Sequence, residues 1–308
     1  MLEVTEATQQ GTPLLDIMVP THNRLDLTMR CLQALYFHTQ SPFHLIVCDA
    51  SDDGMTEIFI NKLRTAGVPP LPKVENLTYI KNSEGNWKEG NQFFNIALQY
   101  CKTEYMATVM NSVRVEPDWE LFAIHNLMAQ NPNIGLIGFK CLFGGESNKA
   151  GFIESAGIRM VKYLPADVGR DLPGHRLTGI SEPDAVQWAF ALLRVKAARG
   201  NLEEGLFHGH RGWDDIDNCF ALKAKGWKIV YCGMGCGYHE PRASRGDNSQ
   251  IAERENRENG IKFYKRWGLW EQFLKDNPED APLHNMPKEV RVAQELQDRT
   301  SFAMEGVA

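Results

Sequence analysis

Short apolar runs alternate with amphipathic segments through the first third of the chain. Each apolar run is followed by a polar turn, which predicts strands at 14–19, 43–48, 77–80 and 105–110. Between them, apolar positions recur at helical spacing and predict helices at 25–37, 56–65 and 87–101. This alternation is typical of a mainly parallel sheet covered by helices. Ligands bind beyond the carboxyl ends of such strands, so we expect a site at the turns after Val19, Cys48 and Met110.

The first predicted helix carries an apolar stripe formed by Leu27, Cys31, Leu32 and Leu35. Asn23 precedes it, and we expect the Asn23 side chain to cap the helix N-terminus.

The second half of the chain is less regular. It predicts helices at 117–130 and 250–270, strands at 134–139, 157–163 and 227–232, and a peripheral helical tail from Asp276 onward. Residues 186–193 predict a buried strand or a buried helix, because periodicity does not separate the two. Residues 168–184 are rich in Pro, Gly and charge, which favours a loop that closes over a ligand.

Composition narrows the class of protein. The 308 residues suit one large domain or two small ones, and the net charge of -6 weighs against a nucleic-acid-binding surface. The longest apolar stretch, 186–198, is interrupted by Arg194 and Lys196, so we expect no transmembrane segment. The first 11 residues lack the order of a signal peptide. We therefore expect a cytoplasmic protein.

The seven cysteines are scattered along the chain, and most lie in apolar patterns where buried reduced thiols are usual. Cys232, Cys236 and His239 superficially suggest zinc, but their spacing matches no common finger and a fourth ligand is missing. We expect no structural zinc.

The run from Gly212 to Phe220 is the strongest chemical feature. It places Asp214, Asp215 and Asp217 within four residues at a predicted helix start. At 3.6 residues per turn, Asp214 and Asp217 share one face and Asp215 projects elsewhere. Close carboxylates shift one another's pKa, which suits a general base. The alternative is a solvated helix cap, favoured by the helix dipole.

Several blocks in order resemble glycosyltransferase family 2, inverting enzymes with the GT-A fold that use nucleotide-diphospho-sugars. The resemblance spans roughly 14–270 and rests on residues 17–24, 46–53, the spaced Asn82, Gly85 and Asn91, and residues 189–194, 213–217 and 263–268.

The resemblance implies an α/β architecture with a Rossmann-like nucleotide-binding half, a mixed central sheet, an acceptor half and C-terminal helices. It implies an N-terminal extension at 1–13, a catalytic domain at 14–240 divided after residue 116, and a C-terminal loop and helical tail at 241–308.

The resemblance also implies roles for single residues. Asp215 would be the general base, and Asp214 would assist it and bind acceptor hydroxyls. The acceptor would also meet Trp188 and Trp213, with core packing the alternative for Trp213 and a structural contact favoured for Asp217. The diphosphate would meet His239, Arg242 and Arg245. The donor would be bound by Pro20, Thr21, Asn23, Asp49, Asp52, Asn82, Asn91, Asn111, Ser112 and Arg114.

The chain departs from the family where an Asp-x-Asp-like triplet normally holds Mg²⁺ or Mn²⁺. Val113 occupies the place of the metal-binding carboxylate, although His239 matches the downstream metal ligand. Three explanations remain: the metal is held weakly by Asn111, His239 and the donor; Arg114, Arg242 and Arg245 replace it; or catalysis is lost. We favour the arginines, because guanidinium groups clamp phosphate oxygens well.

The leading hypothesis is an inverting transferase that uses a nucleotide-diphospho-sugar, with UDP favoured. The alternative is a catalytically silent nucleotide-sugar-binding protein. A nucleotidyltransferase ranks last, because residues 20–24 are not the Gly-rich phosphate loop of that class. The acceptor stays open among a glycan, a lipid-linked saccharide, a metabolite, a protein and a modified nucleic acid, and we expect 168–184 and 207–211 to shape that choice.

Overall fold

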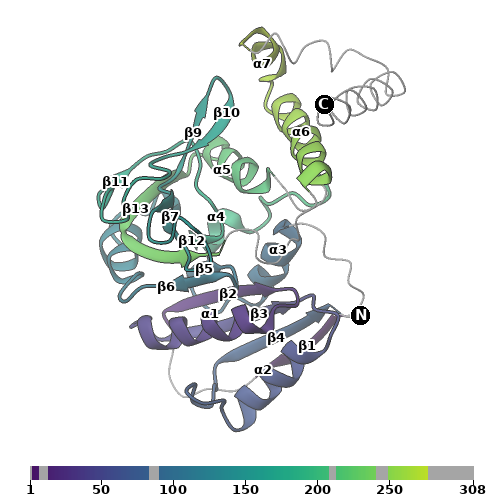
Figure 1. Ribbon diagram of the computed structural model, residues 1–308, viewed down its shortest axis with the longest axis vertical. Coiled ribbons are helices and arrows are strands. Elements are labelled where there is room, and N and C mark those ends of the chain that lie inside the picture. The colour runs from purple at the N-terminus through teal and green to yellow at the C-terminus, as the bar shows by residue number, and fades with distance from the viewer. Residues whose placement is uncertain (1, 7–12, 83–89, 208–212, 241–248, 277–308) are drawn as a thin grey trace, which may run out of the picture.

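The structure is a computed structural model that describes residues 2–6, 13–82, 90–207, 213–240 and 249–276. Within these ranges one mixed sheet of 11 strands runs through the molecule, in the order β1-β4-β3-β2-β5-β12-β7-β13-β11, with β6 beside β13 and β8 beside β7 (Figure 1).

The first half has the predicted alternation of strands and helices. Its parallel strands pair β3 with β4, β2 with β3, and β2 with β5. The elements are β2 (Leu15–Thr21), α1 (Leu25–His38), β3 (Phe43–Asp49), α2 (Met55–Thr65), β4 (Leu77–Asn82), α3 (Gly90–Tyr100) and β5 (Tyr105–Val109).

The second half continues the same sheet. Strand β12 (Phe190–Arg194) lies antiparallel between β5 and β7 (Ile134–Phe143), and β13 (Lys228–His239) runs parallel to β7. Short strands complete the sheet or form a separate hairpin, β9 with β10. They are β6 (Val113–Val115), β8 (Ile153–Ser155), β9 (Ile158–Val161), β10 (Leu164–Asp167) and β11 (Ile180–Ser181).

Two hydrophobic cores cover the two faces of the sheet. Alternate residues of a strand point to opposite faces, and in β2 Ile17 joins the core under α1 and α2 while Met18 joins the core on the other face. That other core contains α3 and the remaining helices, which are α4 (Val195–Ala198), α5 (Asp214–Ala224), α6 (Ser249–Arg266) and α7 (Trp270–Asp276).

The N-cap prediction is wrong. Arg24 holds the cap position of α1 with a positive φ of 51° and no side-chain cap bond. The Asn23 side chain instead accepts a hydrogen bond from the backbone N–H of Asp52, 3.1 Å away. The Asn23 amide therefore joins two turns and leaves the helix start to backbone bonds.

Other boundaries also differ from the predictions. Part of the predicted N-terminal extension is β1 (Leu2–Glu6), which pairs antiparallel with β4. The predicted helix at 117–130 contains a π-helix at Ala123–Met128. The helix predicted at 250–270 ends at Arg266, because Gly268 adopts a positive φ of 66°. Residues 277–308, including the predicted tail, lie outside the described residues.

The segment at 168–184 is fastened to the sheet. Its strand β11 pairs with β13, and the Tyr231 hydroxyl donates to the Leu177 carbonyl at 2.7 Å. Ile153 of β8 donates its backbone N–H to the Leu172 carbonyl at 2.7 Å. The structure thus gives this segment fixed contacts, and its predicted closure over a ligand stays a prediction.

Candidate active site

Helix α5 begins at the acidic run and is anchored by Trp213. Trp213 is 5% exposed, and its ring packs on Phe263 of α6 with centroids 5.2 Å apart. Its Nε1 donates to the Asn256 carbonyl at 3.0 Å. Because α6 covers the ring, the prediction that Trp213 stacks on an acceptor sugar is corrected: this residue belongs to the core and fixes the start of α5.

Asp217 has structural partners. It is 1% exposed, its Oδ1 accepts a hydrogen bond from Trp267 Nε1 at 2.8 Å, and the same oxygen forms an ion pair with Arg266 Nε at 3.2 Å. Burial raises the pKa of the Asp217 carboxyl above its ordinary value. These contacts tie α5 to the end of α6, which is the structural role favoured for Asp217 from the sequence.

Asp214 and Asp215 are half-buried and contact different elements. A Cβ at Gly90 would lie 2.3 Å from Asp214 Oδ2, so this carboxyl sits directly on the start of α3. Asp215 Oδ2 accepts a hydrogen bond from the backbone N–H of Trp188, 3.0 Å away. This bond holds the Asp215 carboxylate beside the segment that leads into β12.

The backbone N–H of Trp188 donates to Asp215, whereas the Trp188 ring lies in the core. The residue is fully buried, and its ring packs on Phe94 with centroids 4.9 Å apart. The prediction that Trp188 contacts the acceptor is therefore corrected: the residue acts through its N–H, which orients Asp215.

Two further carboxylates act electrostatically on the same buried cysteine as Asp215. Burial raises the pKa of the Cys141 thiol well above its ordinary value, and the negative charges of Glu154, Asp167 and Asp215 add to that shift. Sequence reasoning missed Glu154 and Asp167, because neither lies in a block that resembles the family.

Strand pairing brings Val113 and His239 together. They are register partners in the antiparallel pair of β6 and β13, so their side chains share one face. Val113 is fully buried in the core under α1. The Nδ1 atom of His239 lies 2.7 Å from Glu154 Oε2. Val113, where the resemblance implied a metal-binding carboxylate, thus lies opposite His239 and carries an apolar side chain.

The donor atoms at this position do not fit a resident Mg²⁺ or Mn²⁺. Val113 has no ligand atom, and the Asn111 amide donates to the hydroxyls of Thr28 at 3.1 Å and Thr21 at 3.4 Å. Across the described ranges, no group of three or more His, Cys, Asp or Glu side chains is arranged to hold a metal ion. His239 alone is a poor site for hard cations that prefer oxygen.

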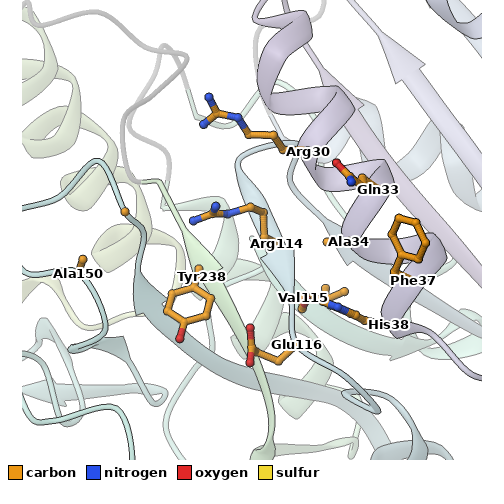
Figure 2. Close-up of a pocket in the computed structure, with 11 residues that line it drawn as sticks. Arg30, Gln33, Ala34, Phe37, His38, Arg114, Val115, Glu116, Ala150 and Tyr238 are labelled. Carbon is orange, nitrogen blue, oxygen red and sulfur yellow. Dashed lines mark hydrogen bonds between the residues drawn. The ribbon is translucent and has the colours of Figure 1, made fainter. Parts of the chain in front are cut away.

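Arg114 faces away from His239. It is the register partner of Tyr238, and its guanidinium lies over the Tyr238 ring, 5.9 Å from the centroid. Neighbouring residues of a strand project to opposite faces, so Arg114 and His239 diverge. Figure 2 shows Arg114 beside Tyr238 and across from α1. Both residues line a cavity of about 490 Å³. This argues against a shared diphosphate clamp. Arg242 and Arg245 lie outside the described residues.

The two turns predicted to contact the nucleotide are bonded to each other. The Asn23 backbone N–H donates to Ser51 Oγ at 2.7 Å, and exposed Asp52 lies 3.5 Å from His22 Nε2. Pro20 and Thr21 are buried at the end of β2. The carboxyl ends of β2 and β3 thus form one joined edge.

Asp49, expected to bind the donor, is fully buried. Its Oδ2 accepts hydrogen bonds from the Tyr79 hydroxyl at 2.6 Å and Lys81 Nζ at 3.1 Å. Its Oδ1 accepts from the Ser51 N–H at 2.8 Å. Both oxygens therefore hold the β3 turn in place.

Four more of the predicted donor residues are also buried, namely Asn82, Asn91, Asn111 and Ser112. Asn91 exchanges amide hydrogen bonds with Asn218, at 2.6 and 3.1 Å, and joins α3 to α5. We therefore remove Asn91 from the donor site. Asn82 ends β4, and the Ser112 carbonyl accepts from the Glu240 N–H at 3.0 Å.

Comparison with known structures shows the class of fold. The chain matches the crystal structure of GalNAc-T7 with UDP, GalNAc and Mn²⁺, with a TM-score of 0.64 and 13% sequence identity over 93% of this chain and 55% of that one. The fold is therefore of the GT-A type, an α/β architecture with a mixed sheet.

At the level of sequence, the chain is similar to a distant relative. No family model matches the chain. It is 26% identical over 273 residues to the uncharacterized protein y4gI of Sinorhizobium fredii (strain NBRC 101917 / NGR234), covering 83% of this chain and 28% of that protein. The chain thus spans little more than a quarter of this relative. Among the described helices, none combines the length and apolar character needed to traverse a bilayer.

Proposed function

We propose that this chain is an inverting glycosyltransferase resembling family 2, which moves a sugar from a UDP-linked donor to an acceptor hydroxyl. The observation that carries the proposal is the half-buried Asp215 carboxylate, oriented at 3.0 Å by the Trp188 N–H. The GT-A fold supports this reading, since GalNAc-T7 shares it and was crystallised with UDP, GalNAc and Mn²⁺.

Asp215 would act as the general base. The acceptor hydroxyl loses its proton to the carboxylate as its oxygen forms a bond to the anomeric carbon. The bond from that carbon to the donor's diphosphate oxygen breaks, and UDP leaves with the bonding electron pair. One displacement inverts the anomeric centre. Asp214, on the start of α3, would bind acceptor hydroxyls and support the base.

The donor would lie along the joined edge of β2 and β3. This edge carries Pro20, Thr21 and Asn23, together with exposed Asp52. Asn111 and Ser112 would border it, since the Asn111 amide reaches Thr21 and Thr28. Asp49 would shape the turn through its bonds to Tyr79 and Lys81.

Release of UDP from a panel of UDP-sugars tests this proposal. The purified chain is incubated with each donor and a mixed glycan acceptor, once with MnCl₂ and once with EDTA. We expect UDP release with at least one donor, and we expect it to persist in EDTA because the site lacks a metal-binding carboxylate. No release from any donor under either condition contradicts the proposal.

A specific observation favours a second candidate, a nucleotide-sugar-binding protein without catalysis. Val113 is fully buried in the core, so the metal position is closed by packing. Binding of a UDP-sugar detected by calorimetry, without release of UDP across varied acceptors, would support this candidate.

A further inference from the structure

Strand β8 contains a one-residue bulge at Glu154. Cys141 of β7 pairs with Ser155, but the next residue, Leu142, pairs with Ile153. Glu154 is thus left without a register partner. Such bulges redirect a side chain out of the regular alternation, and they are common beside active sites.

The bulge directs the Glu154 carboxylate across β7 to β13. His239 is paired with Phe143 of β7, and the Nδ1 atom of His239 lies 2.7 Å from Glu154 Oε2. The Glu154 side chain is 7% exposed and that of His239 is 15% exposed. A carboxylate this buried is costly without a hydrogen-bonded partner, so the contact with His239 compensates its burial.

The contact determines which ring nitrogen of His239 is free. We assign the ring proton of this contact to Nδ1, because a carboxylate oxygen accepts hydrogen bonds. A hydrogen bond at one ring nitrogen orients the imidazole ring and leaves the other nitrogen available to contact a ligand. Here the other nitrogen is Nε2.

The register partner of His239, Val113, supports the assignment of Nε2 as the free ring nitrogen. Val113 shares its face and is fully buried. In the described part of the chain, Glu154 is the residue whose carboxylate contacts the His239 ring. The Glu154 carboxylate reaches His239 from β8, across β7. A metal-binding aspartate of the family would instead have approached His239 from β6.

We propose that Glu154 is a positioning residue for the transfer reaction: it holds the His239 ring through Nδ1 and so presents Nε2 to the diphosphate side of a UDP-linked donor. The inference rests on the proposed function for the identity of the ligand. The orientation of the ring does not depend on it.

The test is the protonation pattern of the His239 ring, followed by two-bond ¹H–¹⁵N NMR on the histidine-labelled full chain. His239→Gln identifies the His239 signals. In the wild type we expect the proton on Nδ1, and we expect added UDP to shift the Nε2 signal. In Glu154→Met, which keeps the size of the side chain but removes the acceptor, we expect both tautomers. Glu154→Gln keeps an acceptor oxygen and should restore the Nδ1 tautomer.

Kinetics give an independent readout. If transfer is detected, Glu154→Met should lower kcat by about tenfold or more while the donor KM changes little, and Glu154→Gln should recover most of the loss. Identical ring signals in the wild type and Glu154→Met overturn the proposal. So does a His239 signal that UDP leaves unmoved, or one that MnCl₂ broadens selectively, since Nε2 would then bind a metal ion. A chain that shows the tautomer change but no transfer contradicts the proposed function and leaves the role of Glu154 standing.

Discussion

At the scale of single residues, the three neighbouring carboxylates of the acidic run have different surroundings in the fold. Asp217 is buried against Trp267 and Arg266. Asp214 sits on the start of α3. Asp215 is oriented by a backbone N–H while half-buried. A base needs a carboxylate that is held in place and still reachable, and of the three Asp215 best meets both conditions.

The closed metal position gives a residue-scale prediction. Val113→Asp puts a carboxylate on the face of His239 inside the core, and we expect a loss of roughly 2–4 kcal/mol in the free energy of unfolding. Mn²⁺ should recover part of this loss by binding the new carboxylate with His239. The measurement is Tm with and without MnCl₂.

Val113→Asn is the matched control, because it buries a polar group of similar size that is a weak ligand for hard cations. Its Tm and that of the wild type should not move with MnCl₂. A rise in the Tm of the wild type would mean that the native residues already hold the ion.

At the scale of elements, α5 is positioned by two neighbours. Asn218 and Asn91 exchange amide hydrogen bonds between α5 and α3, and Trp213 packs on Phe263 of α6. Gly90 has no side chain where Asp214 lies, and a Cβ there would come within 2.3 Å of the carboxyl. The position of Asp215 therefore depends on contacts of the whole helix.

Gly90→Ala tests this packing. The added methyl group must displace the Asp214 carboxyl from the start of α3. Because this carboxyl is the end of a flexible side chain, we expect a cost at the low end of the about 1–3 kcal/mol that is typical of overpacking. We expect a lower midpoint in urea unfolding. Gly179→Ala is the matched control, since nothing lies within 4 Å of its Cβ position and its φ lies outside the left-handed region. A larger effect from the control would contradict the proposed contact.

The contact between α5 and α6 should depend on pH through Asp217. Burial raises the pKa of this carboxyl in the folded protein. Its contribution to stability is therefore fully present below the unfolded pKa of about 4 and is lost as pH rises through the folded value. Asp217→Asn cannot titrate.

Urea unfolding of the wild type and Asp217→Asn, at about pH 4 and about pH 7, measures this effect. We expect the stability advantage of the wild type to shrink as pH rises. An advantage that grows with pH would show that the ion pair with Arg266 outweighs burial.

Much of the element order was predictable because hydrophobic periodicity decides it. The runs at 14–19 and 43–48 became β2 and β3. The caps and bulges were not predictable in the same way. The positive φ of Arg24 and the bulge at Glu154 depend on contacts between distant segments, and a local pattern does not record them.

The candidate site was predictable only in part. The sequence indicates the acidic run, but it does not show that Trp213 and Trp188 are buried or that Arg114 and His239 diverge. Those outcomes follow from register, in which a shift of one residue reverses the face of a side chain.

At the scale of the molecule, the two predicted halves share one sheet. Strand β12 joins β5 to β7, and β6 pairs with β13 across the proposed division at residue 116. A fragment ending at residue 116 would leave an edge of β5 unpaired and would lack the partner of β6.

We therefore expect residues 1–116 alone to be unfolded or aggregated, and the full chain to unfold in a single transition. Far-UV circular dichroism and tryptophan fluorescence should then give coincident curves. Among the described tryptophans, Trp119, Trp188 and Trp213 report on the second half. Two separate transitions would contradict a shared sheet.

The most direct measurement compares Asp215→Asn with the wild type in sugar transfer and in binding of the same UDP-sugar. We expect kcat to fall by roughly 10²- to 10⁴-fold, because the base is gone. The dissociation constant of the donor should change by less than about twofold, since Asp215 acts on the acceptor. Asp217→Asn, the same exchange two positions along α5, should keep kcat and lower Tm. Unchanged turnover in Asp215→Asn would contradict the account.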